Sequence, residues 1–142
     1  MADSHIDAHV HVWTPDIKSY PLGKGYKKEQ MNPASFTPEQ LFSHCRPHGV
    51  KRIVLIQMSY YGFDNGYMLD MMKKHPGVFS GVAVIDEDDQ PARTMQDLAK
   101  QGVRGFRIRQ RERAGNGWLN TKGMATMGKA GAKHGLAMCH LC

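Results

Sequence analysis

The sequence has few cysteines and no long apolar run, and each absence excludes a class of protein. Its three cysteines are an odd number without the spacing of a disulfide framework, so we expect free thiols in a reducing compartment. No apolar stretch approaches the roughly 18 residues that a membrane-spanning helix needs. The first residues also lack the basic region and apolar stretch of a secretory signal. These absences predict a cytoplasmic protein with no membrane partner.

Acidic residues are a minority among the charged residues, at 13 against 19 lysines and arginines, which gives a net charge of +6. Arginines are concentrated in residues 104–113, and a nucleic-acid-binding protein would use such a patch to contact phosphates. The apolar residues Val103, Phe106 and Ile108 instead indicate that this segment begins as a buried strand. An arginine on a buried strand needs a bound anion or a carboxylate partner. We therefore expect a small anionic substrate and no nucleic acid.

The segment Asp7–Trp13 reads D-A-H-V-H-V-W and is the most informative part of the chain. Side chains alternate between the two faces of a strand, so His9 and His11 are predicted to share one face and to reach one ion. The opposite face is predicted to be apolar and to consist of Ile6, Ala8, Val10 and Val12. Neutral imidazole is the commonest protein ligand for zinc-like ions. The alternative is a half-buried strand whose histidines are incidental.

Strand-like and helix-like segments alternate along the rest of the chain. The predicted strands cover about residues 5–13, 53–58, 78–85, 103–109 and 136–141, and the predicted helices cover about residues 37–46, 64–74, 91–100 and 120–134. The long connection over residues 14–36 exceeds an ordinary loop and is typical of a functional loop or lid.

This alternation predicts right-handed parallel βαβ units, for which two architectures are available. An open doubly wound sheet usually has a glycine-rich turn after its first strand, and residues 11–15 have none. In a (β/α)8 barrel the reactive residues lie at the carboxyl ends of the strands. That is where the sequence has its polar candidates, namely His9, His11, Gln57, Asp86, Arg107, Arg109 and His140. We therefore predict an α/β fold, a partial TIM (β/α)8 barrel of about five parallel strands and four helices.

Four segments in the right order resemble the amidohydrolase-related branch of the amidohydrolase superfamily. They are D-A-H-V-H-V-W, V-L-I-Q-M followed by Y-Y-G-F-D-N, G-V-A-V-I-D and G-V-R-G-F-R-I-R. Within that branch they are most similar to lactonases of dicarboxylate and sugar-acid lactones. A complete barrel needs about 250 residues. The resemblance therefore implies that residues 1–142 are a single domain, the N-terminal half of an amidohydrolase-type barrel.

The resemblance also implies roles for particular residues. His9 and His11 match a pair that binds a divalent metal, zinc being the first candidate, or that lies beside the substrate carbonyl in lactonases that use no metal. Arg107 and Arg109 match the strand that holds a substrate carboxylate, Gln57 lies where a substrate contact is expected, and His140 matches a metal ligand or substrate contact. The histidine and the aspartate that complete the site in the family would lie beyond Cys142.

Two consequences follow for the chain as it stands. A catalytic zinc site normally has three protein ligands and a water, so two histidines predict weak metal binding and little catalysis. Five strands of a barrel leave two unpaired edges, which predicts a homo-oligomer. The expected activity is hydrolysis of a carboxylate-bearing lactone or amide. The alternatives are a decarboxylase or hydratase of the same fold and a noncatalytic fragment that binds anions.

Overall fold

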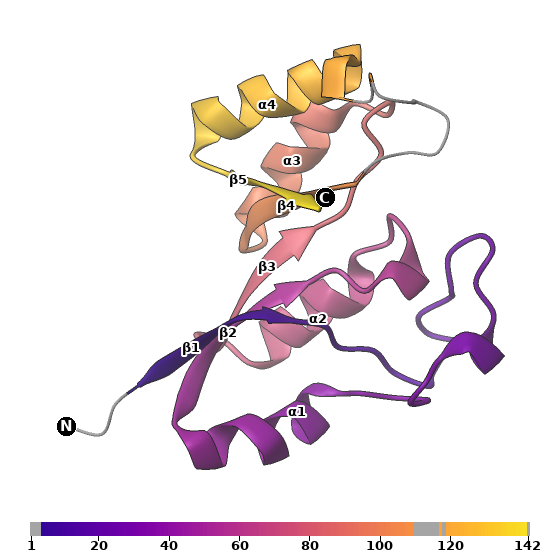
Figure 1. The fold of residues 1–142 in the computed structure, drawn as a ribbon, viewed down its shortest axis with the longest axis vertical. Helices are drawn as coiled ribbons and strands as arrows, with labels where there is room; N and C mark the ends of the chain where they lie inside the picture. The colour runs from indigo at the N-terminus through magenta and orange to yellow at the C-terminus, as the bar shows by residue number, and fades with distance from the viewer. Residues whose placement is uncertain (1–3, 110–116, 118, 142) are drawn as a thin grey trace.

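Five parallel strands form one sheet in the computed structural model, which describes residues 4–109, 117 and 119–141. The strands are β1 (His5–Val10), β2 (Val50–Ile56), β3 (Phe79–Ala83), β4 (Val103–Arg109) and β5 (Ala137–Leu141). Their order is β1-β2-β3-β4-β5, so each strand lies beside the one that precedes it in the sequence, and the sheet curls as it proceeds (Figure 1). This is the arrangement of a partial (β/α)8 barrel, and the predicted fold is confirmed.

A helix connects each strand to the next. The helices are α1 (Pro38–Cys45), α2 (Gly66–Lys74), α3 (Pro91–Lys100) and α4 (Lys122–His134). In Figure 1, α1 and α2 lie beside β1 and β2, whereas α3 and α4 lie beside β4 and β5. None of these helices, in the part of the chain that is described, has the length and apolarity to cross a membrane.

The start of α1 shows why the sequence predicts helix ends well. Thr37 accepts a hydrogen bond from the backbone of Gln40 at 3.5 Å, and the Gln40 side chain accepts one from the backbone of Thr37 at 2.7 Å. This is a capping box, and Pro38 occupies the first helical position, where its missing N–H costs nothing. Gly49 ends the turn that follows α1 with a φ of 76°, which favours glycine.

The predicted apolar face of the first strand is confirmed for Val10 and Val12 but wrong for Ala8, because the pairing of β1 with β2 shifts register between Asp7 and Val10. Asp7 pairs with Ile53 and Val10 pairs with Leu55, so three steps along β1 match two along β2. Such a bulge reverses the alternation of the side chains. As a result Ala8 and His9 both line the concave face, whereas Val10 packs against the core.

The core lies between the sheet and its helices. The strands contribute Ile53, Leu55, Phe106 and Ile108, all at most 2% exposed, and the helices contribute several methionines. Met68 and Met72 of α2 are buried, as the apolar stripe of that helix predicts. The residues between these strand positions, among them Val54 and Arg107, face the concave side.

The long connection over residues 14–36 is tied to the elements beside it. Trp13 and Phe36 form an antiparallel bridge at its two ends. The Tyr20 hydroxyl donates to Asp70 of α2 at 2.8 Å, and the backbone N–H of Gly23 donates to the carbonyl of Tyr60 at 2.7 Å. These hydrogen bonds hold the connection against α2 and against the segment that follows β2.

Candidate active site

A cavity of about 370 Å³ opens on the concave face of the sheet, opposite the helices. Small and apolar side chains of β1, β2 and β3, including Ala8 and Val54, form much of its surface. Polar side chains reach the same cavity from β1, β4 and β5, namely His9, Arg104, Arg107, Cys139 and His140. The fold therefore brings three of the predicted site residues, His9, Arg107 and His140, to one cavity.

His9 and His11 form a close pair at the carboxyl end of β1. Their Nε2 atoms lie 3.3 Å apart, and their rings meet edge to face at 82°. The Nδ1 atom of His11 lies 2.8 Å from the carbonyl oxygen of Ile56 on the neighbouring strand. A carbonyl oxygen can only accept, so Nδ1 of His11 carries the proton and Nε2 keeps its lone pair. The lone pair of His11 is thus aimed at the Nε2 atom of His9.

The surroundings of His11 keep it neutral. Burial lowers its pKa from 6.5. The hydrogen bond to Ile56 opposes this effect, and electrostatic interactions with His9 and Arg107 lower the pKa further. The imidazole is therefore uncharged at pH 7. Neutral imidazole is the form that binds a metal or accepts a proton.

The spacing of the two histidines fits a zinc-like ion. Two nitrogens bound tetrahedrally at about 2.0–2.1 Å lie about 3.3–3.4 Å from each other, and the observed Nε2 distance is 3.3 Å. Within residues 4–109, 117 and 119–141, however, no three His, Cys, Asp or Glu side chains come together. The described chain thus offers two ligands, one fewer than a catalytic zinc site has.

The structure does not bring His140 to the histidine pair as a third ligand. His140 lines the same cavity from β5, where its partner in the ladder is Ile108, a residue of the core. Its neighbour Cys139 pairs with Arg107 and therefore shares the concave face with it. Both β5 residues lie across the cavity mouth from β1, because three strands separate β5 from β1 in the sheet.

Arg107 and Arg109 lie at the end of β4, and both are half-buried. Burial lowers the pKa of Arg107, and the charge of Arg109 lowers it further. The ion pairs found among the described residues join Glu39 to Lys74 and His75, and Asp97 to Arg93 and Lys100, so neither β4 arginine has a carboxylate partner there. Two adjacent guanidinium groups without such a partner are suited to bind a carboxylate. Two further arginines of the arginine-rich segment 104–113, Arg111 and Arg113, lie outside the described residues.

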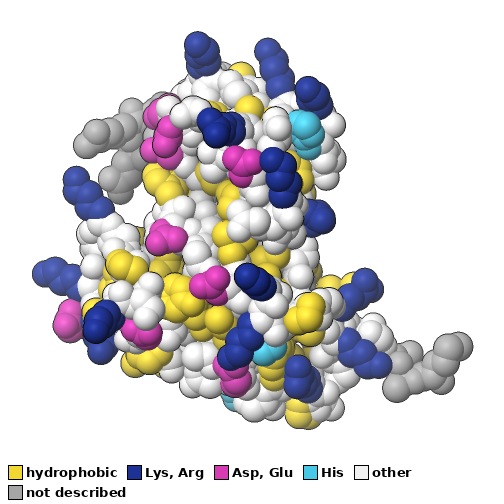
Figure 2. Space-filling view, turned by 180° about the vertical axis from the view of Figure 1, so that it is seen from behind, with side chains coloured by type: hydrophobic (Ala, Val, Ile, Leu, Met, Phe, Trp, Pro, Cys, Tyr) yellow, Lys and Arg dark blue, Asp and Glu magenta, His cyan; other side chains and the backbone are white. Residues whose placement is uncertain are grey.

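The positive charge on the face shown in Figure 2 is dispersed. Figure 2 shows lysine and arginine side chains spread over one face of the molecule, around a central apolar band. They form no single continuous patch in that view.

Gln57 lies apart from the concave face. It is 2% exposed, and its amide donates to the carbonyl of Asp64 at 2.6 Å and to that of Gly62 at 3.5 Å. These contacts hold the loop between β2 and α2 in place. The predicted contact of Gln57 with substrate remains untested, and the observed contacts are those of a residue that positions a loop.

Glu87 is a candidate that sequence reasoning missed. It is 6% exposed and lines a second cavity, of about 160 Å³, together with Arg107, Arg109 and Phe63. The hydroxyl of Thr121 donates to Glu87 Oε1 at 3.1 Å. A signal was present, since Glu87 lies just beyond the predicted third strand, over residues 78–85. Its partner, however, is 34 residues away, and sequence spacing does not indicate that contact.

Comparison with known proteins agrees with the barrel geometry described above. Residues 6–139 match the amidohydrolase family. A curated 2-pyrone-4,6-dicarboxylate hydrolase from Comamonas testosteroni is 33% identical over 104 residues, which are 72% of this chain and 32% of that protein. The chain thus spans about a third of the length of that relative.

Solved structures share the fold. A protein from Pseudomonas putida described as a 2-pyrone-4,6-dicarboxylic acid hydrolase has a TM-score of 0.74 at 24% identity, over 95% of this chain and 47% of that chain. An amidohydrolase from Burkholderia multivorans with bound zinc has a TM-score of 0.70 at 17% identity, over 96% of this chain and 48% of that one. A 2,6-dihydroxybenzoate decarboxylase from Rhizobium has a TM-score of 0.66 at 12% identity, over 96% and 49%. These chains are about twice as long as this one.

Proposed function

The chain belongs to the amidohydrolase family, and from that premise we propose that it forms the carbonyl-activating and anion-binding half of a hydrolase site for a carboxylate-bearing lactone. One observation carries the proposal. His9 and Arg107 line the same cavity, His11 contacts His9, and Arg107 is near enough to His11 to lower its pKa. A reactive carbonyl and a carboxylate of one small molecule can therefore be held at the same time.

Hydrolysis of a lactone requires a polarised carbonyl, an attacking water and a proton for the departing oxygen. A divalent ion held by His9 and His11, zinc being the first candidate, would polarise the carbonyl and make the water more acidic. His9 and His11 are suited to this task because their Nε2 atoms face one point. Arg107 and Arg109 orient the substrate through charge-assisted hydrogen bonds to its carboxylate.

The relatives support this choice of substrate class. The Comamonas testosteroni relative is named as a hydrolase of a pyrone dicarboxylate, which is a lactone with two carboxylates. The zinc in the Burkholderia multivorans structure supports a metal at the histidine pair. The described chain supplies no third ligand and no further carboxylate at that pair, so the proposal assigns this chain half of a site and low activity by itself.

Zinc uptake tests the ligand assignment. We expect the purified chain to take up zinc in equilibrium dialysis against an excess of the ion, and the His9→Ala, His11→Ala double variant to take up less. A His48→Ala, His134→Ala double variant is the matched control, since both of these histidines are exposed and lie outside the cavity. Equal zinc content in the wild-type chain and the His9, His11 variant would refute the assignment.

Turnover tests the reaction. Acid release at constant pH from a panel of carboxylate-bearing lactones should be slow, and Arg107→Gln should lower it by about tenfold or more, because a hydrogen bond to a charged group contributes about 1.5–3 kcal/mol. Carbon dioxide released in place of acid would assign the chain to decarboxylation. No turnover of any lactone by a zinc-loaded chain would contradict the proposal.

A further inference from the structure

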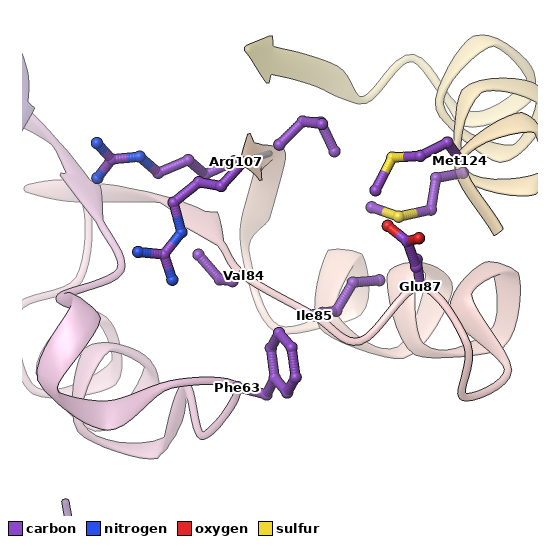
Figure 3. Close-up of a pocket in the computed structure, with 9 residues that line it drawn as sticks. Phe63, Val84, Ile85, Glu87, Arg107 and Met124 are labelled. Carbon is purple, nitrogen blue, oxygen red and sulfur yellow. The ribbon is translucent and has the colours of Figure 1, made fainter. Parts of the chain in front are cut away.

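The smaller cavity places Glu87, a carboxylate that the proposed function does not use, together with the two arginines of the proposed site. Its volume is about 160 Å³, and Figure 3 shows Arg107 and Glu87 at opposite ends of it. Phe63, Val84 and Ile85 lie along one wall, and Met124 of α4 lies on another. The cavity is therefore cationic at one end, anionic at the other and apolar in between.

The Glu87 carboxylate is held in a fixed position. Thr121 donates to its Oε1 atom at 3.1 Å, and the same hydroxyl accepts the backbone N–H of Met124 at 3.1 Å as the N-cap of α4. The first turn of α4 also presses on the backbone of Glu87, since a methyl group on Gly123 would overlap that backbone. Because the carboxylate is already held in place, binding of a ligand does not have to offset the entropy cost of ordering this side chain.

The carboxylate is also accessible from the cavity, because Glu87 is one of the residues that line it. Thr121 donates one hydrogen bond to it, and an ionised carboxylate accepts about four. Glu87 is 6% exposed, so a hydrogen bond from a ligand forms where little water competes. A hydrogen bond to a charged group in such surroundings is stronger than one in water, so a ligand that brings a donor gains affinity there.

We propose that this cavity is a subsite for a short carboxylate that carries a hydrogen-bond donor, a hydroxyl or an ammonium group, at its far end. The carboxylate binds Arg107 and Arg109, the donor binds Glu87 from the cavity, and the methylene chain lies against Phe63 and Met124. A water occupies about 30 Å³ of liquid volume, so a cavity of about 160 Å³ has room for such a chain. The anionic end rests on the proposed function, because the same arginines hold the carboxylate there.

Three ligands of equal length test the proposal. They are 4-aminobutyrate, 4-hydroxybutyrate and pentanoate, which differ only in a terminal ammonium, hydroxyl or methyl group. Each is titrated into the ¹⁵N-labelled chain, and the dissociation constant is taken from the backbone chemical shifts of α4 and of the end of β3. We expect both donor-bearing ligands to bind about tenfold or more tightly than pentanoate, as one hydrogen bond to a buried charge requires.

Two variants assign that preference to Glu87. Glu87→Gln keeps the shape and an oxygen for Thr121 but removes the charge, so the preference for 4-aminobutyrate should fall by about tenfold. Asp89→Asn removes the same charge from an exposed residue outside this cavity and should leave the ranking of the three ligands unchanged. The ranking on the wild-type chain stands as a test even if Glu87→Gln does not fold.

Equal binding of the three ligands, or saturable binding of none, would overturn the inference. The same holds if Glu87→Gln and Asp89→Asn change the ranking equally. The outcome is separable from that of the proposed function: a flat ranking with intact hydrolysis overturns this inference alone, and lost zinc uptake with an intact ranking contradicts the proposed function alone.

Discussion

At the scale of single residues, a backbone carbonyl decides the chemistry of the histidine pair. The oxygen of Ile56 takes the Nδ1 proton of His11, and this leaves a lone pair on Nε2. His9 is exposed at the cavity surface, so it is free to turn its own Nε2 atom towards a ligand. The ring of His11 is thus oriented by the backbone, whereas the ring of His9 can rotate to meet a ligand.

The hydrogen bond of His11 leads to a spectroscopic prediction. In the metal-free chain at pH 7, His11 should be the neutral tautomer with its proton on Nδ1, because the carbonyl of Ile56 accepts from that atom and burial disfavours the charged ring. Long-range ¹H–¹⁵N correlation spectra of the histidine side chains distinguish the two nitrogens. The His11→Ala variant identifies the signal and serves as the control. A proton on Nε2, or a charged ring at pH 7, would contradict the geometry of this pair.

Some residues were predictable and some were not. The pairing of His9 with His11, and the presence of Arg107 at the same cavity, follow from strand phase at the end of a barrel strand. Glu87 was missed because its significance depends on Thr121, which packing brings to it from α4. A polar residue at a strand end can either contact a substrate or hold the loop that follows. Sequence alone does not distinguish these roles for Gln57, and the fold shows that it holds a loop.

At the scale of helices and strands, the sequence predicts termini better than it predicts faces. The bounds of α3 and β4 match their predicted residues, since Pro91 begins the helix and Gly102, with a φ of 98°, separates it from the strand. The register shift in β1 depends on its pairing with β2. Alternation within β1 alone could not indicate that shift, so the predicted face of Ala8 is wrong.

The contact between α4 and the loop after β3 leads to a stability prediction. Gly123→Ala should lower the free energy of unfolding by about 1–3 kcal/mol, because the added methyl group would overlap the backbone of Glu87. Gly128→Ala in the same helix should raise it by up to about 1 kcal/mol, since no atom lies near its added methyl group and alanine favours a helix.

Urea unfolding followed by circular dichroism measures both variants. Because the two substitutions are identical in chemistry and lie in one helix, the difference between them reports the contact with Glu87. Equal effects of the two substitutions would show that α4 does not press on the loop that carries Glu87.

At the scale of the whole molecule, the chain forms a curled sheet of five strands, about half of a (β/α)8 barrel. The concave face that carries the site is also the face that the remaining strands of a barrel would enclose. In the described residues β1 and β5 each pair on one side only. A site of this kind holds a substrate from one side and leaves the other side open to water, which weakens the electrostatic interactions on which catalysis depends.

The open face leads to the prediction that the chain self-associates. Ile6 is 52% exposed and lines a groove on β1 to β3 beside the unpaired edge of β1, so a second copy would gain by covering it. Ile6→Lys should weaken association by about tenfold or more, because burying an isoleucine contributes about 1.5–3 kcal/mol and 1.4 kcal/mol is a factor of ten. Ile17→Lys is the matched control, since Ile17 is 36% exposed on the connection over residues 14–36.

Sedimentation velocity over a range of protein concentrations separates the outcomes. Association that is weakened by Ile6→Lys and unchanged by Ile17→Lys would assign the contact to the open face and its edges. A monomer at every concentration would contradict the prediction and would mean that the bulge in β1 protects that edge by itself, as irregular edge strands do in natural sheets. Equal weakening by both variants would instead attribute the association to general surface hydrophobicity.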